Sequence, residues 1–287
     1  MTRLSLPGRD ISIGDGAPLT VMAGLNVLES RELALRVADH LKAVCERLGL
    51  PYVFKASYDK ANRSSIMSYR GPGLDDGLEI LSAVKAEFGV PVVTDYHTPD
   101  EAEPVAEVAD VLQVPAFLCR QTDLVVAGAE AVTARGGWLH VKKAQFMAPW
   151  DARNIVSKVG EVTGAANPTI LCERGTSFGY NNLVVDMLAI PEMKALGVPV
   201  TMDATHAVQL PGADPRTAGS STGGRRAGVP VIARAAVAAG ADGVFLEFHP
   251  EPDKALCDGP SCLPLDSAEA LLAGLAALHE CAGVPQV

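Results

Sequence analysis

Residues 18–57 read PLTVMAGLNVLESRELALRVADHLKAVCERLGLPYVFKAS, and this stretch decides the fold. It begins and ends with a short apolar run of the length of a β-strand. Between the two runs, apolar side chains recur at helical spacing over residues 31–48, with Ser30 placed to cap the first turn and Gly49 just beyond the last. Strands that are apolar on both faces and alternate with helices are typical of a buried parallel sheet.

Runs of the same kind recur along the chain. Eight of them, each rich in Val, Ile or Leu and each ending in polar residues, are PLTVMAGLN, PYVFKAS, VPVVTDYH, DVLQVPA, GWLHVKKAQ, TILCERG, VPVTMDATH and DGVFLEFHP. Eight strand-then-helix units in 287 residues predict one α/β domain over residues 1–287, a (β/α)8 TIM barrel. An open doubly wound sheet is less favoured, because no GxGxxG motif follows the first strand. A barrel gathers its active site at the carboxyl ends of its strands.

The composition restricts the classes of partner. A formal net charge of −10 and a pI near 5.1 disfavour a general surface for nucleic acid or anionic membranes, which needs clustered positive charge. The six cysteines lack CxxC spacing, and we expect them to be reduced thiols. The amino-terminal segment lacks the apolar core of a signal peptide, and no later stretch is apolar over roughly 18 residues. We therefore expect a cytoplasmic protein without a membrane partner.

The segment that follows the second predicted strand is basic and rich in hydroxyl and amide groups. It reads YVFKASYDKANRSS, and its candidate binding side chains are Lys55, Ser57, Lys60, Asn62, Arg63 and Ser64. Cations beside short hydroxyl and amide donors bind phosphate and carboxylate. A solvated basic loop is the alternative, but a position directly after a barrel strand favours a binding site.

Further cations follow the fifth and sixth predicted strands, namely Lys142 with Lys143, and Arg174. Paired lysines at a strand end are often surface charge. In an acidic protein, however, several cations that converge on one barrel mouth indicate a substrate with several negative charges. Two phosphorylated or carboxylated reactants would fit this pattern.

Three acidic or imidazole side chains near the later strand ends form a separate group. His206, Glu247 and Asp258 could ligate a divalent metal or transfer protons. Each of these residues alone is more often structural, but three at successive strand ends indicate a functional site. The glycine-rich stretch PGADPRTAGSSTGGRR, residues 211–226, follows the seventh strand and is predicted to be a mobile active-site loop.

At these residues the chain resembles the 3-deoxy-D-manno-octulosonate 8-phosphate synthases, which share a superfamily with the 3-deoxy-D-arabino-heptulosonate 7-phosphate synthases. The resemblance covers nearly the whole chain, through GLNVLES, FKASYDKANRSS, PAFLCRQTDL, VKKAQF, ERGTSFGYNNLVVDM, DATHAVQ and HPEPDKALCDGP. It implies a transferase of lipopolysaccharide sugar biosynthesis. Such an enzyme condenses phosphoenolpyruvate with D-arabinose 5-phosphate and water, and releases 3-deoxy-D-manno-octulosonate 8-phosphate and phosphate.

The resemblance also implies roles for individual residues. Phosphoenolpyruvate would be surrounded by Lys55, Ser57, Lys60, Gln113, Lys142 and Arg174, with the backbone near Ala116 at its phosphate. The phosphate of arabinose 5-phosphate would bind to Asn62, Arg63 and Ser64. The implied catalytic candidates are Asn26, Lys142, His206, Glu247 and Asp258. The resemblance further implies a homotetramer, in which the sugar phosphate site borders a neighbouring subunit.

One residue of the first strand bears on metal use. Metal-dependent members of the family have Cys in a GPC-type segment where this chain has Asn26, and residues 257–260, CDGP, resemble the metal-independent type. A neutral amide is a poor replacement for a thiolate as a metal ligand. We therefore expect no required cofactor, although His206, Glu247 and Asp258 could hold a divalent metal weakly.

The segment after the second predicted strand differs from related sequences in two places. Residues 60–64, KANRS, differ from the KPRT-type segment that heptulosonate synthases typically carry for the shorter erythrose 4-phosphate. Met67 stands where the family pattern SSIHSYRG has His, and this change concerns local packing or the subunit contact.

Three other functions stay open at the level of sequence. A heptulosonate synthase would use erythrose 4-phosphate, and the KANRS segment disfavours it. A Schiff-base aldolase would use Lys55 or Lys142 as its nucleophile. A binding protein would have kept the barrel without turnover, and it would have no need of the group formed by His206, Glu247 and Asp258.

Overall fold

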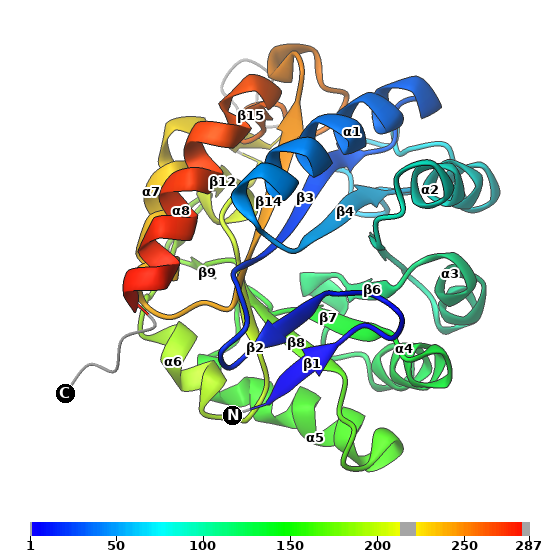
Figure 1. Ribbon diagram of the computed structural model, residues 1–287, viewed down its shortest axis with the longest axis vertical. Helices are drawn as coiled ribbons and strands as arrows, with labels where there is room; N and C mark the ends of the chain where they lie inside the picture. The colour runs from blue at the N-terminus through cyan, green and yellow to red at the C-terminus, as the bar shows by residue number, and fades with distance from the viewer. Residues whose placement is uncertain (1, 213–221, 283–287) are drawn as a thin grey trace.

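The computed structural model describes residues 2–212 and 222–282. Within these ranges, eight parallel strands form a closed barrel surrounded by helices (Figure 1). The barrel strands are β3 (Thr20–Val27), β4 (Tyr52–Ser57), β5 (Val92–Asp95), β6 (Val111–Val114), β7 (Trp138–Lys142), β8 (Thr169–Glu173), β11 (Val200–Asp203) and β14 (Gly243–His249). Pairing of β14 with both β11 and β3 closes the ring. Each predicted apolar run contains one of these strands, and the (β/α)8 prediction is confirmed.

The helices lie outside the barrel and follow the strands in chain order. They are α1 (Arg31–Leu48), α2 (Leu74–Phe88), α3 (Ala102–Val108), α4 (Thr122–Arg135), α5 (Arg153–Thr163), α6 (Ala189–Lys194), α7 (Val229–Ala238) and α8 (Ala268–Ala282). Helix α1 begins as predicted, because the Ser30 hydroxyl accepts a hydrogen bond from the Leu33 backbone N–H. It ends at Gly49, whose φ of 65° lies in the left-handed region that glycine adopts without strain.

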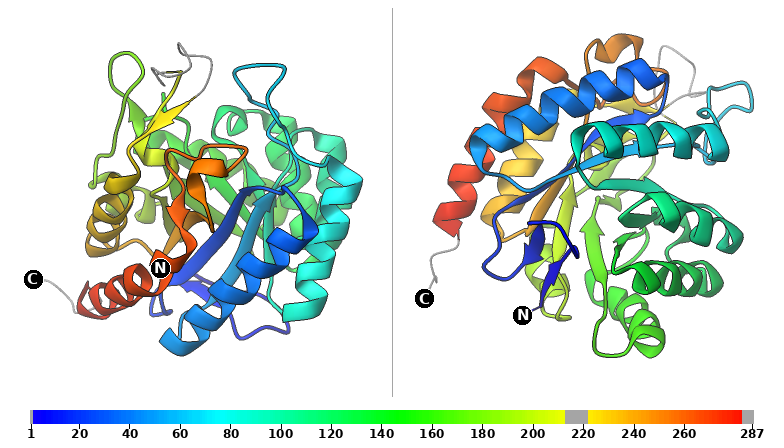
Figure 2. Two further views of the ribbon diagram at one scale, coloured as in Figure 1. Left: turned by 90° about the horizontal axis from the view of Figure 1, so that it is seen from above. Right: turned by 45° about the vertical axis from the view of Figure 1, so that its right-hand side comes forward.

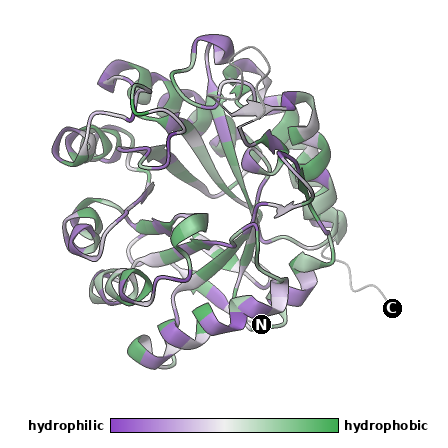
Figure 3. Cartoon of the chain, turned by 180° about the vertical axis from the view of Figure 1, so that it is seen from behind, coloured by the Kyte–Doolittle hydropathy of each residue, from purple (hydrophilic) through white to green (hydrophobic). Residues whose placement is uncertain are grey.

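The apolar core has two parts. One fills the space between the strands and the helices, and Figure 3 shows it as hydrophobic strands and helix faces turned toward each other, with hydrophilic residues outside. The other fills the inside of the barrel near the amino ends of the strands, and its members are Leu6, Ile13, Met22, Val53, Val93, Val111, Trp138, Ile170 and Phe245. The inside of the barrel is therefore a packed core and not a channel.

A short hairpin at the amino terminus closes this end of the barrel. It consists of β1 (Arg3–Ser5) and β2 (Ser12–Gly14), which pair antiparallel. Leu6 and Ile13 from the hairpin are buried against the apolar barrel interior. This hairpin was not predicted from the sequence, because strands of three residues carry too little periodicity to be recognised.

The loops that follow the strands gather at the opposite end. The left panel of Figure 2 shows the loop after β4 (cyan) and the region of β12 (Gln209–Leu210) and β13 (Gly223–Gly224) rising on the same side of the barrel. The remaining short strands are β9 (Thr176–Ser177), β10 (Leu183–Val184) and β15 (Leu263–Pro264). Residues 213–221, most of the predicted mobile loop, lie outside the described residues. No helix in the described part of the chain is long and apolar enough to cross a membrane.

Candidate active site

A cavity opens at the carboxyl ends of the barrel strands. Its larger part has a volume of about 770 Å³ and its smaller part about 190 Å³, and both parts are lined by Lys60, Asn62, Arg174 and His206. Most of the predicted site residues line one part or the other: Lys60, Asn62, Arg63, Ser64, Gln113, Ala116, Lys142, Arg174, His206 and Asp258. These residues come from strand ends and loops far apart in the sequence, and closure of the barrel brings them together.

The inner wall of the cavity is mainly cationic, with Asp95 as a carboxylate in the same lining. Lys60, Lys142 and Arg174 all line the smaller part, and each is at least nine-tenths buried. Burial opposes the charge of Lys60, but the carboxylates of Asp95 and Glu247 outweigh it and hold the pKa of this ammonium above its ordinary value. Arg174 donates from Nη2 to Gln209 Oε1 at 3.0 Å, whereas its buried Nη1 has no hydrogen-bond partner among the described residues. Arg174 therefore has a buried N–H group that can donate a hydrogen bond to a bound anion.

Asp203 orients two residues of the cavity. Its Oδ2 lies 2.6 Å from Lys142 Nζ and 2.7 Å from His206 Nδ1, and its Oδ1 accepts the His206 backbone N–H at 2.9 Å. Burial raises the pKa of the Asp203 carboxyl, but His206 and Lys142 outweigh it and hold the pKa well below its ordinary value. Because Nδ1 of His206 faces Asp203, its Nε2 is directed at the other carboxylates, 3.7 Å from Glu247 and 3.8 Å from Asp258.

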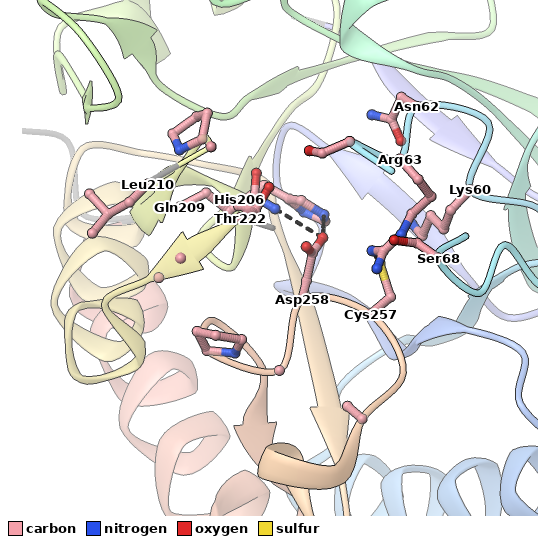
Figure 4. Close-up of a pocket in the computed structure, with 18 of the residues that line it drawn as sticks. Lys60, Asn62, Arg63, Ser68, His206, Gln209, Leu210, Thr222, Cys257 and Asp258 are labelled. Carbon is pink, nitrogen blue, oxygen red and sulfur yellow. Dashed lines mark hydrogen bonds and ion pairs between the residues drawn. The ribbon is translucent and has the colours of Figure 1, made fainter. Parts of the chain in front are cut away.

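Asn26 lies between two of these carboxylates. Its Nδ2 donates to Glu247 Oε2 at 2.6 Å and to Asp258 Oδ2 at 3.2 Å, and Gln209 Nε2 donates to the same Asp258 oxygen at 2.9 Å. Figure 4 shows Asp258, His206 and Gln209 directed at one another. A cation bound by both carboxylates would have to displace these amide hydrogen bonds, so the residues do not fit a metal site as they stand. Within residues 2–212 and 222–282, no His, Cys, Asp and Glu group is arranged to hold a metal ion.

An ion pair between Lys55 and Glu247 lies beneath the cavity. Lys55 Nζ donates to Glu247 Oε1 at 2.5 Å and to the Asn26 carbonyl at 2.9 Å, and both charged side chains are fully buried. Burial lowers the pKa of Lys55 to about 8, against the opposing effect of Glu247. Gly24 of β3 is the register partner of both Lys55 and Glu247, and a side chain there would collide with the Lys55 carbonyl. Gly24 therefore lets β4 lie close against β3, in the register that brings Lys55 and Glu247 together across β3.

Four predicted site residues thus lie below the cavity and do not line it: Asn26, Lys55, Ser57 and Glu247. Three of them belong to the hydrogen-bonded group just described. The buried Ser57 hydroxyl has no hydrogen-bond partner in the described ranges.

The two lysines at the end of β7 separate. Lys142 lines the cavity, whereas the Lys143 ammonium is buried and donates to the carbonyls of Ala144 and Met147 and to the Thr176 hydroxyl. Successive side chains at a strand end point to opposite faces. Lys143 therefore stabilises the loop that follows β7, and grouping it with the cations of the mouth was wrong.

The loops after β4 and β14 meet at the outer part of the cavity. The Arg63 guanidinium donates to the Cys257 sulfur, and its Nη2 lies 3.5 Å from the Leu256 carbonyl oxygen. Figure 4 shows Arg63, Lys60 and Cys257 together, apart from Gln209 and His206. The cavity thus has an outer cationic end at Arg63 and an inner one at Lys142 and Arg174.

The comparison with known families covers nearly the whole chain. A model described as the DAHP synthetase I family matches residues 2–281. The chain belongs to the DAHP synthetase I family. Three relatives are each named 2-dehydro-3-deoxyphosphooctonate aldolase. The protein from Desulfosudis oleivorans is 54% identical over 95% of each chain, and that from Azotobacter vinelandii is 54% identical over 97% of this chain and 95% of its own. The protein from Nitratidesulfovibrio vulgaris is 58% identical over 90% of this chain and 91% of its own.

Some residues of the site were missed at the level of sequence. Gln209 bridges Arg174 and Asp258, and Gln145, Phe117 and Cys257 line the cavity. Gln145 and Gln209 do lie in the quoted motifs VKKAQF and DATHAVQ. The available signal was position: Gln145 ends the predicted run GWLHVKKAQ, and Gln209 lies just beyond VPVTMDATH. An uncharged amide has no distinctive pattern of its own.

The buried ion pair generates a stability prediction. Glu247→Gln leaves the Lys55 ammonium buried without a carboxylate, and we expect the free energy of unfolding in urea to fall by ~3–5 kcal/mol. Adding Lys55→Met removes the unpaired charge and should recover a large part of the loss. Glu269→Gln is the control, because the Arg47–Glu269 pair is exposed and screened by water. A double variant as unstable as Glu247→Gln would contradict the interpretation.

The contribution of the same pair to stability should depend on pH in the acid range. Burial raises the pKa of Glu247, but His206 and Lys55 outweigh it and lower the pKa to about 2 from an ordinary 4.5. A depressed carboxyl pKa contributes stability that is present above the unfolded value and is lost as pH falls from about 4.5 toward about 2. In Glu247→Gln this part of the acid-induced loss should be absent.

Proposed function

We propose that this chain, as a single barrel domain, is a transferase that condenses phosphoenolpyruvate with D-arabinose 5-phosphate and water. The products are 3-deoxy-D-manno-octulosonate 8-phosphate and phosphate, in lipopolysaccharide sugar biosynthesis. One observation carries the proposal: a single cavity joins two cationic ends and a group of proton-transferring side chains. The names of the relatives support the same reaction class.

The two cationic ends suit two anionic reactants. We assign the inner end, with Lys60, Lys142 and Arg174, to phosphoenolpyruvate, which carries a carboxylate and a phosphate. The outer end, with Asn62 and Arg63, is assigned to the phosphate of the sugar. Lys55 and Ser57 lie too deep to line the cavity, so they support the inner end from below.

The reaction requires positioning and charge stabilisation more than a covalent enzyme intermediate. C3 of phosphoenolpyruvate forms a bond to the aldehyde carbon of the sugar, and water adds at C2. One proton of the water goes to the aldehyde oxygen. Phosphate then leaves with the other proton as its bond to C2 breaks and C2 becomes a ketone. Cations near both reactants stabilise the developing charge. His206 and Asp258, oriented by Asp203, Asn26 and Gln209, are the groups placed to move protons.

The alternatives fit the geometry less well. A Schiff-base aldolase needs a free lysine amine, but Lys55 is paired with Glu247 and Lys142 with Asp203. A protein that only binds has no need of the His206, Glu247 and Asp258 group beneath its cationic wall. A heptulosonate synthase shares the inner end, and the outer segment that contains Asn62 and Arg63 is the part that disfavours it.

The first test is a phosphate-release assay. With phosphoenolpyruvate present, we expect turnover with arabinose 5-phosphate and little with erythrose 4-phosphate. The reverse preference would identify a heptulosonate synthase. Silence with both sugars, combined with borohydride trapping of a substrate on the chain, would support the aldolase instead.

The sugar phosphate assignment is tested by Arg63→Ala. Removing the guanidinium should raise the KM for arabinose 5-phosphate by ~10–100-fold, since a charged hydrogen-bonding contact is lost, and leave the KM for phosphoenolpyruvate nearly unchanged. Arg70→Ala is the control, because Arg70 in the same loop pairs with Asp59 and does not line the cavity. Equal losses for both substrates would contradict the assignment.

We also propose that catalysis requires no metal. The support is the Asn26 amide, which donates to both Glu247 and Asp258. A strong chelator should leave the activity unchanged, and abolished activity would overturn this proposal. Asn26→Cys places a thiol beside two carboxylates and a histidine, and cobalt(II) titration should then produce thiolate-to-metal absorption. Asn154→Cys, on the exposed side of α5, should show none.

A homotetramer and a cytoplasmic location complete the proposal. Large apolar side chains are exposed on loops that follow the barrel strands: Ile66, Met67, Phe117, Phe146, Phe178 and Tyr180. Such side chains are typical of surfaces that bind another protein chain, and light scattering of the purified chain would measure the assembly. The six cysteines are all free, which suits a reducing compartment, and cell fractionation would test it.

A further inference from the structure

A hydrogen-bonded group inside the barrel lies directly beneath the inner end of the cavity. His140 of β7 places Nδ1 3.2 Å from Gln113 Oε1 and Nε2 2.8 Å from Thr201 Oγ1. The His140 ring stacks on Phe245, with centroids 5.8 Å apart and planes 9° from parallel. His140 and Thr201 are fully buried, and Gln113 nearly so. His140 therefore connects the apolar floor of the barrel to the wall of the cavity.

The surroundings of His140 keep it uncharged. Burial and the nearby Lys142 ammonium lower the pKa of His140 to about 3, despite an opposing effect of Asp203. A neutral imidazole has one N–H, so one ring nitrogen donates and the other accepts. The two neighbours must then take opposite roles.

The Gln113 oxygen indicates which nitrogen donates. An amide oxygen only accepts, and Gln113 Oε1 lies 3.2 Å from His140 Nδ1, so Nδ1 carries the imidazole proton and donates to it. Nε2 is then an acceptor, and the Thr201 hydroxyl, 2.8 Å away, donates to it in preference to the Leu171 carbonyl at 3.4 Å.

The hydrogen bond from His140 fixes the orientation of the Gln113 amide. With its oxygen held by His140, its nitrogen is turned toward the smaller part of the cavity, which Gln113 lines together with Lys142 and Arg174. In the described part of the chain, Gln113 Nε2 has no hydrogen-bond partner. A flipped amide would present an oxygen to an incoming anion and repel it.

We infer that His140 is a positioning residue, which holds Gln113 so that its amide N–H groups donate to the anionic end of phosphoenolpyruvate. The inference rests on the proposed function for the identity of that anion. An amide donor adds a hydrogen bond to a carboxylate or phosphate without adding charge to a wall that is already cationic. His140 does not touch the substrate and acts through Gln113.

The tautomer of His140 is the first measurement. Nitrogen-15 NMR of histidine-labelled wild-type chain should show an imidazole that stays neutral and protonated at Nδ1 throughout pH 5 to pH 9, and His140→Phe should remove this signal. A charged ring, or protonation at Nε2, would overturn the inference. This readout needs no turnover, so it is independent of whether the proposed reaction is correct.

Kinetics provides the second measurement. Thr201→Val removes the hydroxyl that donates to Nε2 and so supports the Nδ1–H tautomer, and His140→Phe removes both ring nitrogens but keeps an aromatic ring against Phe245. Each should raise the KM for phosphoenolpyruvate by ~10-fold, the loss of about one hydrogen bond, with a much smaller change for the sugar.

Thr169→Val is the matched control, because the buried Thr169 hydroxyl has no hydrogen-bond partner in residues 2–212 and 222–282. It should leave both KM values unchanged. An active wild type whose KM for phosphoenolpyruvate is unaffected by Thr201→Val and His140→Phe would overturn the inference alone. An inactive wild type would overturn the proposed function, while the NMR result would still decide the position of the imidazole proton.

Discussion

The buried ion pair between Lys55 and Glu247 is the interaction on which the carboxyl end of the barrel depends. Neither charge reaches water, so each is stabilised by the other and by the hydrogen bonds around it. Lys55 also holds the Asn26 carbonyl, and Glu247 holds the Asn26 amide. The pair therefore fixes the end of β3 between β4 and β14. Through Asn26 the pair also contacts Asp258, which Gln209 holds from the other side.

The distribution of charge around the cavity explains how an acidic protein can attract anions. Two buried carboxylates at the barrel mouth are paired with cations: Asp203 with Lys142 and His206, and Glu247 with Lys55. The Arg174 guanidinium keeps one buried nitrogen without a hydrogen-bond partner among the described residues. A buried cation with a free hydrogen-bond donor concentrates positive potential in the cavity, because little water screens it there. The cavity can therefore attract anions even though the net charge is −10.

Neutral amides link the charged groups of this site, and each has a defined orientation. Gln209 accepts from Arg174 through its oxygen and donates to Asp258 through its nitrogen. Asn26 directs its nitrogen at two carboxylates. An amide can donate or accept depending on which way it faces, so the neighbours that orient these side chains are part of the chemistry. In the proposed role of His140, the same principle extends to Gln113.

The sequence by itself determined the barrel and the identity of most residues at its mouth. Apolar runs, the helical spacing between Ser30 and Gly49, and chain length are local properties, and parallel strands direct their carboxyl ends to one side. Only the tertiary structure decided which side chains touch. Lys55 and Glu247 are separated by 192 positions in the sequence and meet across Gly24 because of strand register. The packing of the amino-terminal hairpin against the barrel interior was likewise a tertiary outcome, since contacts between distant strands arise only when the barrel closes.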